Sequence, residues 1–124
     1  MQLAGSGIRI VRIEELENQR FDLADSIEGG DRLLSGDWQV LFHRHSCPAC
    51  RDRVLEFEKV LAKRPGSSSL ALIEVPPFDG SVQTPSESSD LDRFKLPAET
   101  RWIIPTPTEL LVRNGQVVKT LGHN

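Results

Sequence analysis

Both cysteines of this 124-residue chain, Cys47 and Cys50, lie in the stretch HRHSCPACRDR, residues 43–53. Side chains three residues apart on a helix are neighbours, about 5–6 Å from each other. A disulfide needs Cα atoms about 4.4–6.8 Å apart. The spacing therefore permits a reversible disulfide across one helical turn. Because a bridge that closes so short a loop constrains the unfolded chain very little, we expect a role in chemistry rather than in stability.

Three functions fit these residues. In the first, Cys47 attacks a disulfide of a protein partner and Cys50 resolves the mixed disulfide. In the second, His43, His45 and the two cysteines bind zinc or copper. Alternate strand residues point to opposite faces, and the sequence has no second Cys-x-x-Cys pair, which weakens this alternative. In the third, the pair is vestigial and residues 79–100 make a non-catalytic adapter. The first is our prediction.

The surroundings of Cys47 favour a thiolate. We expect Cys47 at the N-terminus of a helix, where unpaired N–H groups and the helix dipole lower the pKa of a thiol. His45 and Pro48 are the candidates to tune this thiolate, because they lie two residues before it and directly after it. Positively charged side chains are also close to Cys47 in the sequence: His43, Arg44, Arg51 and Arg53. Asp52 is the one acidic residue of the stretch.

Composition excludes several classes of protein. The chain is 38% apolar and 27% charged, which is typical of a soluble globular domain, and we predict one domain over residues 1–124. A net charge of −3 argues against nucleic-acid binding. No apolar run approaches the roughly 18 residues of a membrane span. We find no nicotinamide or flavin fingerprint, so no cofactor is expected and the electrons are exchanged with another protein or a small thiol.

The start of the sequence bears on the compartment. It lacks the basic start and the apolar stretch of about 7–15 residues that make a secretory signal. This absence is expected of a cytoplasmic protein, but it does not decide between two alternatives. An extracytoplasmic location is expected instead if the chain is a fragment or a tethered domain of a membrane-associated system.

The pattern of apolar residues predicts an α/β sandwich with a mixed sheet. WQVLFH reads as a buried central strand, and Asn114-Gly115 as the turn of a hairpin. We expect Ser46 to cap the helix. The first half of the chain is expected to hold a strand at 7–13 inside an N-terminal extension (1–19), a helical piece and loops (14–37), a strand at 38–43 and a helix at 48–63. The second half is expected to hold a strand at 69–75, a flexible loop (79–100) with a helical turn or two in DLDRFKL, a short apolar segment at 101–104, and the hairpin (105–121).

The order of these motifs resembles the thioredoxin-fold thiol–disulfide oxidoreductases. A strand, SCPACR, an amphipathic helix and TPTELLVRNGQVV follow one another as in that family, over about residues 20–121. The stretch from RFDL to CPACR is similar in layout to the TlpA- and MauD-like branch. The resemblance implies a mixed central sheet flanked by helices. It also implies that Pro107 is a cis-proline and that Thr106 and Pro107 offer backbone groups to an extended partner peptide.

The sequence departs from the family at positions near the cysteines. Ser46 replaces the usual tryptophan, and Leu41 stands where the family has a buried acidic residue. This leaves Glu74 as the candidate proton acceptor for Cys50. By resemblance, Cys-Pro-x-Cys implies a reduction potential above the roughly −270 mV of thioredoxin.

The sequence also ends at Asn124, just after the hairpin, without the family's last helix. We expect the N-terminal segment, or another chain, to cover the sheet face that would otherwise be exposed.

Overall fold

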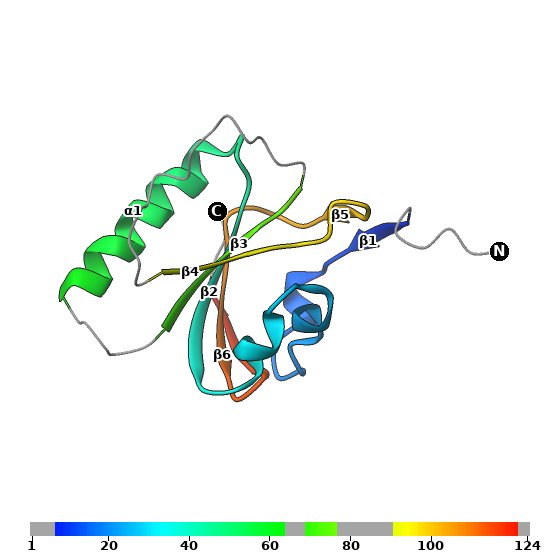
Figure 1. Ribbon diagram of the computed structural model, residues 1–124, viewed down its shortest axis with the longest axis horizontal. Helices are drawn as coiled ribbons and strands as arrows, with labels where there is room; N and C mark the ends of the chain where they lie inside the picture. Colours follow the sequence, from blue (N-terminus) through cyan, green and yellow to red (C-terminus); the bar gives the residue numbers. More distant parts are fainter. Residues whose placement is uncertain (1–6, 64–68, 77–90, 122–124) are drawn as a thin grey trace.

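The computed structural model describes residues 7–63, 69–76 and 91–121, and its centre is a five-stranded mixed sheet (Figure 1). Strand β2 is parallel to β3, β3 is parallel to β4, and the hairpin β6–β7 joins the other side of β2 in antiparallel order. The spatial order is β4-β3-β2-β6-β7. The strands are β2 (Asp37–His43), β3 (Ser69–Glu74), β4 (Leu91–Lys95), β6 (Thr108–Arg113) and β7 (Gln116–Leu121).

The central strand confirms the prediction for residues 38–43. Val40, Leu41 and Phe42 are consecutive and all fully buried. Because consecutive strand residues point to opposite faces, both faces of the sheet are covered at this point. The next strand repeats the pattern with Ala71, Leu72 and Ile73.

Helix α1 (Pro48–Lys63) covers one of these faces, with the bounds that the sequence predicted. Val54 forms a buried cluster with Leu41, Leu70 and Leu72 from β2 and β3. Pro48 takes the first helical position, where its missing N–H costs no hydrogen bond. The residue directly before the helix is Cys47, whose sulfur accepts the backbone N–H of Cys50 at 3.1 Å. The expected cap at Ser46 is therefore wrong by one residue.

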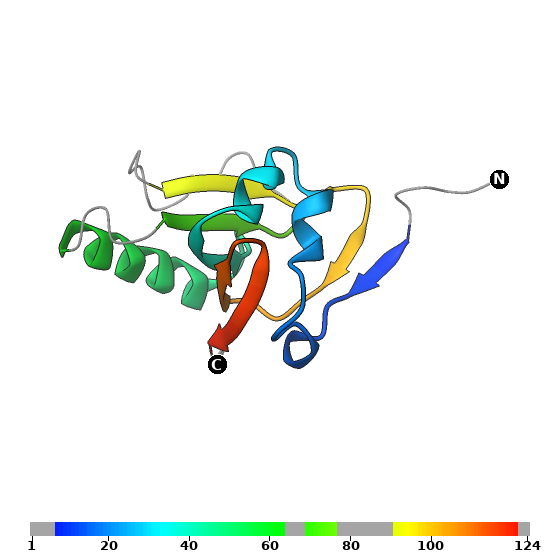
Figure 2. The ribbon, with the colours of Figure 1, turned by 90° about the horizontal axis from the view of Figure 1, so that it is seen from below.

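The N-terminal segment covers the opposite face of the sheet (Figure 2). It contains three short 3-10 helices, η1 (Ile13–Glu15), η2 (Asp22–Ser26) and η3 (Gly30–Leu34). Phe21 and Leu33 are fully buried, and the Phe21 ring meets Phe42 of β2 edge to face at 6.4 Å. The N-terminal segment therefore covers the sheet face opposite α1.

The predicted strand at residues 7–13 is right only for its first half. Strand β1 (Ile8–Ile10) pairs in parallel with β5 (Arg101–Ile103) in a separate two-stranded sheet. At Ile13 the chain instead enters η1, because Val11 and Ile13 turn inward and join the core beneath the central sheet.

The segment 79–100 differs from the prediction where the structure describes it. Instead of helical turns in DLDRFKL, residues Leu91–Lys95 form β4. Phe94 and Leu96 alternate with exposed or half-buried residues and are buried, and the Phe94 ring lies 6.4 Å from Trp38. A period of two fits a strand and not a helix. The remainder of the expected loop, residues 79–90, lies outside the described residues.

The hairpin is confirmed. Asn114 and Gly115 both have positive φ, 51° and 83°, as its two-residue turn requires. The Gly115 carbonyl accepts the N–H of Phe21 at 2.8 Å. A Cβ atom at Gly115 would lie 3.1 Å from the carbonyl oxygen of Leu34, so the turn also needs glycine to fit against the N-terminal segment.

Candidate active site

Two turns meet at one end of the five-stranded sheet. The first follows β2 and leads through Arg44 to Cys47 and α1. The second, residues 104–107, leads into β6. Phe42 near the end of β2 pairs with Thr108 at the start of antiparallel β6, so both turns leave the sheet at the same end. The Thr106–Pro107 peptide bond in the second turn is cis, as the resemblance implied.

The two cysteines form a disulfide at the start of α1, with Cα atoms 5.2 Å apart. They differ sharply in exposure. Cys47 is partly accessible, whereas Cys50 is 1% exposed. Cys47 is therefore the more accessible of the two cysteines. The N–H of Cys50 already points at that sulfur, so a charge that develops on it has a backbone donor in place.

Two of the arginines expected to support the thiolate have other partners. The Arg44 guanidinium donates to the carbonyl oxygens of Pro76, at 2.7 Å, and Trp102, at 3.0 Å. These two hydrogen bonds connect the end of β2 to the chain after β3 and to β5. The Arg53 guanidinium binds Glu56 and Glu109. Both guanidinium groups thus have partners other than the Cys47 sulfur.

The sequence analysis missed Glu109. This residue of β6 is 5% exposed and lies opposite Leu41 of β2 in the antiparallel register. Its carboxylate accepts two hydrogen bonds from Arg53, one of them from Nη2 to Oε1 at 2.7 Å. Arg53, which holds this carboxylate, follows Cys50 by three residues and so lies about one helical turn further along α1.

Leu41 stands where the resembling family has a buried acidic residue. In this structure the acidic side chain comes instead from Glu109, opposite Leu41 on the neighbouring strand. The carboxylates bound to Arg53 raise the pKa of its guanidinium, and the hydrogen bond that Arg53 donates to Glu109 is the largest cause. In the sequence, only the alternation in TELLVR points to Glu109, because it places this residue on one face of its strand. This is a weak signal for a residue of the site. Pairing it with Leu41 needs the strand register, which the sequence does not contain.

A row of polar side chains crosses the same end of the sheet. His43 pairs with Glu74, and Glu74 pairs with Lys95. Burial of His43, with the positive charge of Arg93, lowers the pKa of its imidazole to about 4. Burial raises the pKa of Glu74, and the charges of Lys95 and His45 oppose this rise. His43 is accordingly neutral near pH 7.

The described residues offer little for the metal-binding alternative. No group of three or more His, Cys, Asp or Glu side chains in residues 7–63, 69–76 and 91–121 could hold a metal ion. The two sulfurs are bonded to each other, and His43 is 7% exposed. None of the helices in this part of the chain is long and apolar enough to cross a membrane.

Comparison with known proteins identifies the fold. No protein-family model matches this chain. No curated protein matches it either. Among solved structures, the chain is similar to the thioredoxin domain of a thiol-disulfide oxidoreductase from Bacteroides vulgatus, with 12% sequence identity and a TM-score of 0.54. The match covers 76% of this chain and 75% of the other. The fold is therefore thioredoxin-like: in the described residues, a mixed sheet carries a single α-helix.

Proposed function

We propose that this protein is a thiol–disulfide oxidoreductase that exchanges its Cys47–Cys50 disulfide with cysteines of partner proteins. One observation carries the proposal. Cys47, a partly exposed residue at the start of a helix, is disulfide-bonded to the buried Cys50 on a thioredoxin-like fold. The layout of residues 20–51 supports placing the chain beside the TlpA- and MauD-like branch.

The exchange proceeds in two balanced steps. In the reducing direction, the Cys47 thiolate attacks a partner disulfide, forming one S–S bond and releasing one partner thiolate. Cys50 then loses its proton and attacks the Cys47 sulfur. The mixed disulfide breaks, the second partner thiolate leaves, and the Cys47–Cys50 disulfide forms. The partner gains two electrons and this protein loses two. The oxidising direction is the reverse.

The remaining site residues have supporting roles in this proposal. Thr106 and Pro107 form the turn against which an extended partner peptide binds beside Cys47. Pro48 fixes the first turn of the helix behind the sulfur, and His45 adjusts the charge around it. Glu109, held by Arg53, is the buried carboxylate on the side of Cys50 and replaces Glu74 as our candidate to influence its proton.

Paired cysteine variants test the proposal. We expect Cys47→Ser to reduce thiol exchange with a disulfide-containing peptide to the uncatalysed rate. We expect Cys50→Ser to accumulate a mixed disulfide with that peptide, seen by mass spectrometry. Ala49→Ser is the matched control, because it adds a hydroxyl to the same exposed turn and leaves both sulfurs in place. Full activity of Cys47→Ser would refute the mechanism.

A further inference from the structure

The small β1–β5 sheet presents an apolar surface beside the candidate active site. In its parallel register Ile8, Ile10, Arg101 and Ile103 share one face, and Arg9 and Trp102 share the other. The three isoleucines are 62%, 57% and 48% exposed, in chain order. Exposed large apolar side chains that gather on one face indicate a binding surface.

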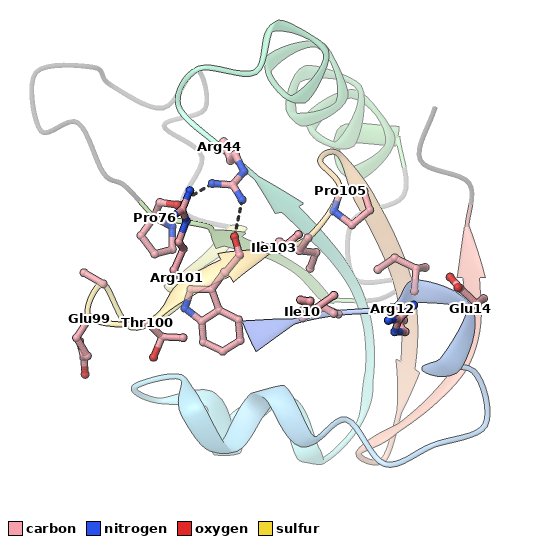
Figure 3. A pocket seen from close by; sticks show the side chains of 15 residues that line it. Ile10, Arg12, Glu14, Arg44, Pro76, Glu99, Thr100, Arg101, Ile103 and Pro105 are labelled. Carbon is pink, nitrogen blue, oxygen red and sulfur yellow. Dashed lines mark hydrogen bonds between the residues drawn. The ribbon is translucent and has the colours of Figure 1, made fainter. Parts of the chain in front are cut away.

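This face opens onto a hollow of about 970 Å³. Figure 3 shows Ile10 and Ile103 facing it, with Arg44 and Pro105 on the side toward the active site. Pro105 precedes Pro107 by two residues, so the hollow continues into the turn that we place beside Cys47. A partner bound on the β1–β5 sheet therefore reaches both turns of the candidate site, at Arg44 and at Pro105.

The outer edge of β1 is open to pairing. The carbonyl of Gly7 accepts the N–H of Arg101, and the N–H of Val11 donates to Ile103. Since the backbone groups of a strand alternate in direction, those of Ile8 and Ile10 point away from β5. Among the described strands, none pairs with that side of β1. An exposed edge of this kind accepts an extended peptide as an added strand.

Charge indicates what kind of strand fits. The six residues of β1 and β5 include Arg9 and Arg101 and no acidic residue, in a chain whose net charge is −3. Arg9 is exposed, and its guanidinium lies 5.5 Å from the centre of the Trp102 ring. An added strand would complement β1 with apolar side chains beside Ile8 and Ile10 and a carboxylate beside Arg9.

A second copy of this chain fits less well. If two β1 strands pair in antiparallel order with their isoleucines aligned, Arg9 of one copy lies directly opposite Arg9 of the other. Like charges in that position are destabilising. Charge complementarity therefore favours a different protein, one that carries an acidic residue between two apolar residues.

We infer that β1 docks an extended segment of a partner protein, with alternating apolar and acidic side chains, as an added strand. This inference rests on the proposed function, because it names the partner that the cysteine pair would serve. Its test is nevertheless independent of cysteine chemistry, since binding can be measured in the Cys47→Ser/Cys50→Ser double variant. Binding without exchange in the unaltered protein would refute the proposed function alone, and exchange without binding would refute this inference alone.

The experiment measures fluorescence anisotropy of a short labelled peptide of alternating valine and glutamate. We expect saturable binding that is lost when the peptide amides facing β1 are N-methylated, and retained when the alternate amides are N-methylated instead. No binding, or equal effects of the two methylation patterns, would overturn the inference. So would binding of the protein to vesicles of anionic phospholipid without any binding of the peptide.

Charge reversal supplies the specific control. We expect Arg9→Glu to weaken binding of the glutamate peptide at least about fivefold, the equivalent of about 1 kcal/mol. The same variant should bind a valine–lysine peptide better than the unaltered protein does, a gain that a misfolded variant could not show. Exchange with a small dithiol should be unchanged. If both proteins bound the two peptides alike, charge would not select the partner and the inference would be wrong.

Discussion

The two faces of the five-stranded sheet are covered by segments of different character. On one face, the N-terminal segment packs an apolar layer that includes Phe21 and Leu33 against β2 and its neighbours. On the other face, α1 combines buried apolar side chains with charge: Arg53 bonds to the buried Glu109, and the polar His43 is buried in the same layer. The difference separates two tasks. The N-terminal face stabilises the fold, and the helix face holds the cysteines and the ionisable groups around them.

The largest effect on stability is expected from the N-terminal face. Phe21→Ala removes a fully buried ring that contacts Phe42. Deleting such a ring costs about 3–5 kcal/mol of unfolding free energy, measurable by urea denaturation of the oxidised protein. The matched control is Leu55→Ala on α1, where the side chain is 39% exposed and we expect less than about 1 kcal/mol. Equal losses for the two variants would remove the contrast between the faces.

The second effect is a pH dependence that comes from the helix face. The pKa of His43 falls from 6.5 in the unfolded chain to about 4 in the folded protein. Between these values the unfolded chain binds more protons, so stability is full above pH 6.5 and is lost as the pH falls toward 4. The expected loss is on the order of 3 kcal/mol.

Comparison with His43→Gln isolates this contribution. The variant should lose less stability than the unaltered protein over that pH range, in denaturation curves recorded at several pH values. If the two proteins lost the same stability between pH 6.5 and 4, His43 would not be the titrating group.

The smallest effect sharpens the comparison within the helix face. Glu109 and Glu56 bind the same guanidinium of Arg53, but their side chains are 7% and 57% exposed. Glu109→Gln weakens a largely buried pair, and we expect a loss of about 2 kcal/mol. This is less than for a fully buried pair, because the Arg53 side chain is 35% exposed. Glu56→Gln should cost at most about 0.5 kcal/mol. Thermal denaturation measures both, and a larger loss for Glu56→Gln would contradict the assignment.

Much of the fold could be predicted where the signal is local. The run WQVLFH, the period of residues 48–63 and Asn114-Gly115 each carry their structure in a few neighbouring residues, and all three predictions are confirmed. The prediction of helical turns in DLDRFKL was wrong, because this segment becomes a strand by pairing with β3. The early end of the first strand likewise depends on the core that Ile13 enters.

The site shows the same division. The Cys47–Cys50 disulfide was predicted from the spacing of the cysteines, and the cis bond before Pro107 from the family resemblance. Glu109 was missed because its proximity to α1 follows from strand register and from its bond to Arg53. The partners of Arg44, the carbonyls of Pro76 and Trp102, lie 32 and 58 residues further along the chain. Contacts of such long range leave no trace in the local pattern.

The most direct test of the account is a redox titration of metal-free protein in glutathione buffers, followed by tryptophan fluorescence and by a count of free thiols. The account predicts one reversible two-electron transition, with a midpoint above the roughly −270 mV of thioredoxin. The midpoint would show whether the protein tends to reduce or to oxidise its partners. The absence of any transition would contradict the proposed function, and a midpoint below about −270 mV would contradict the predicted potential.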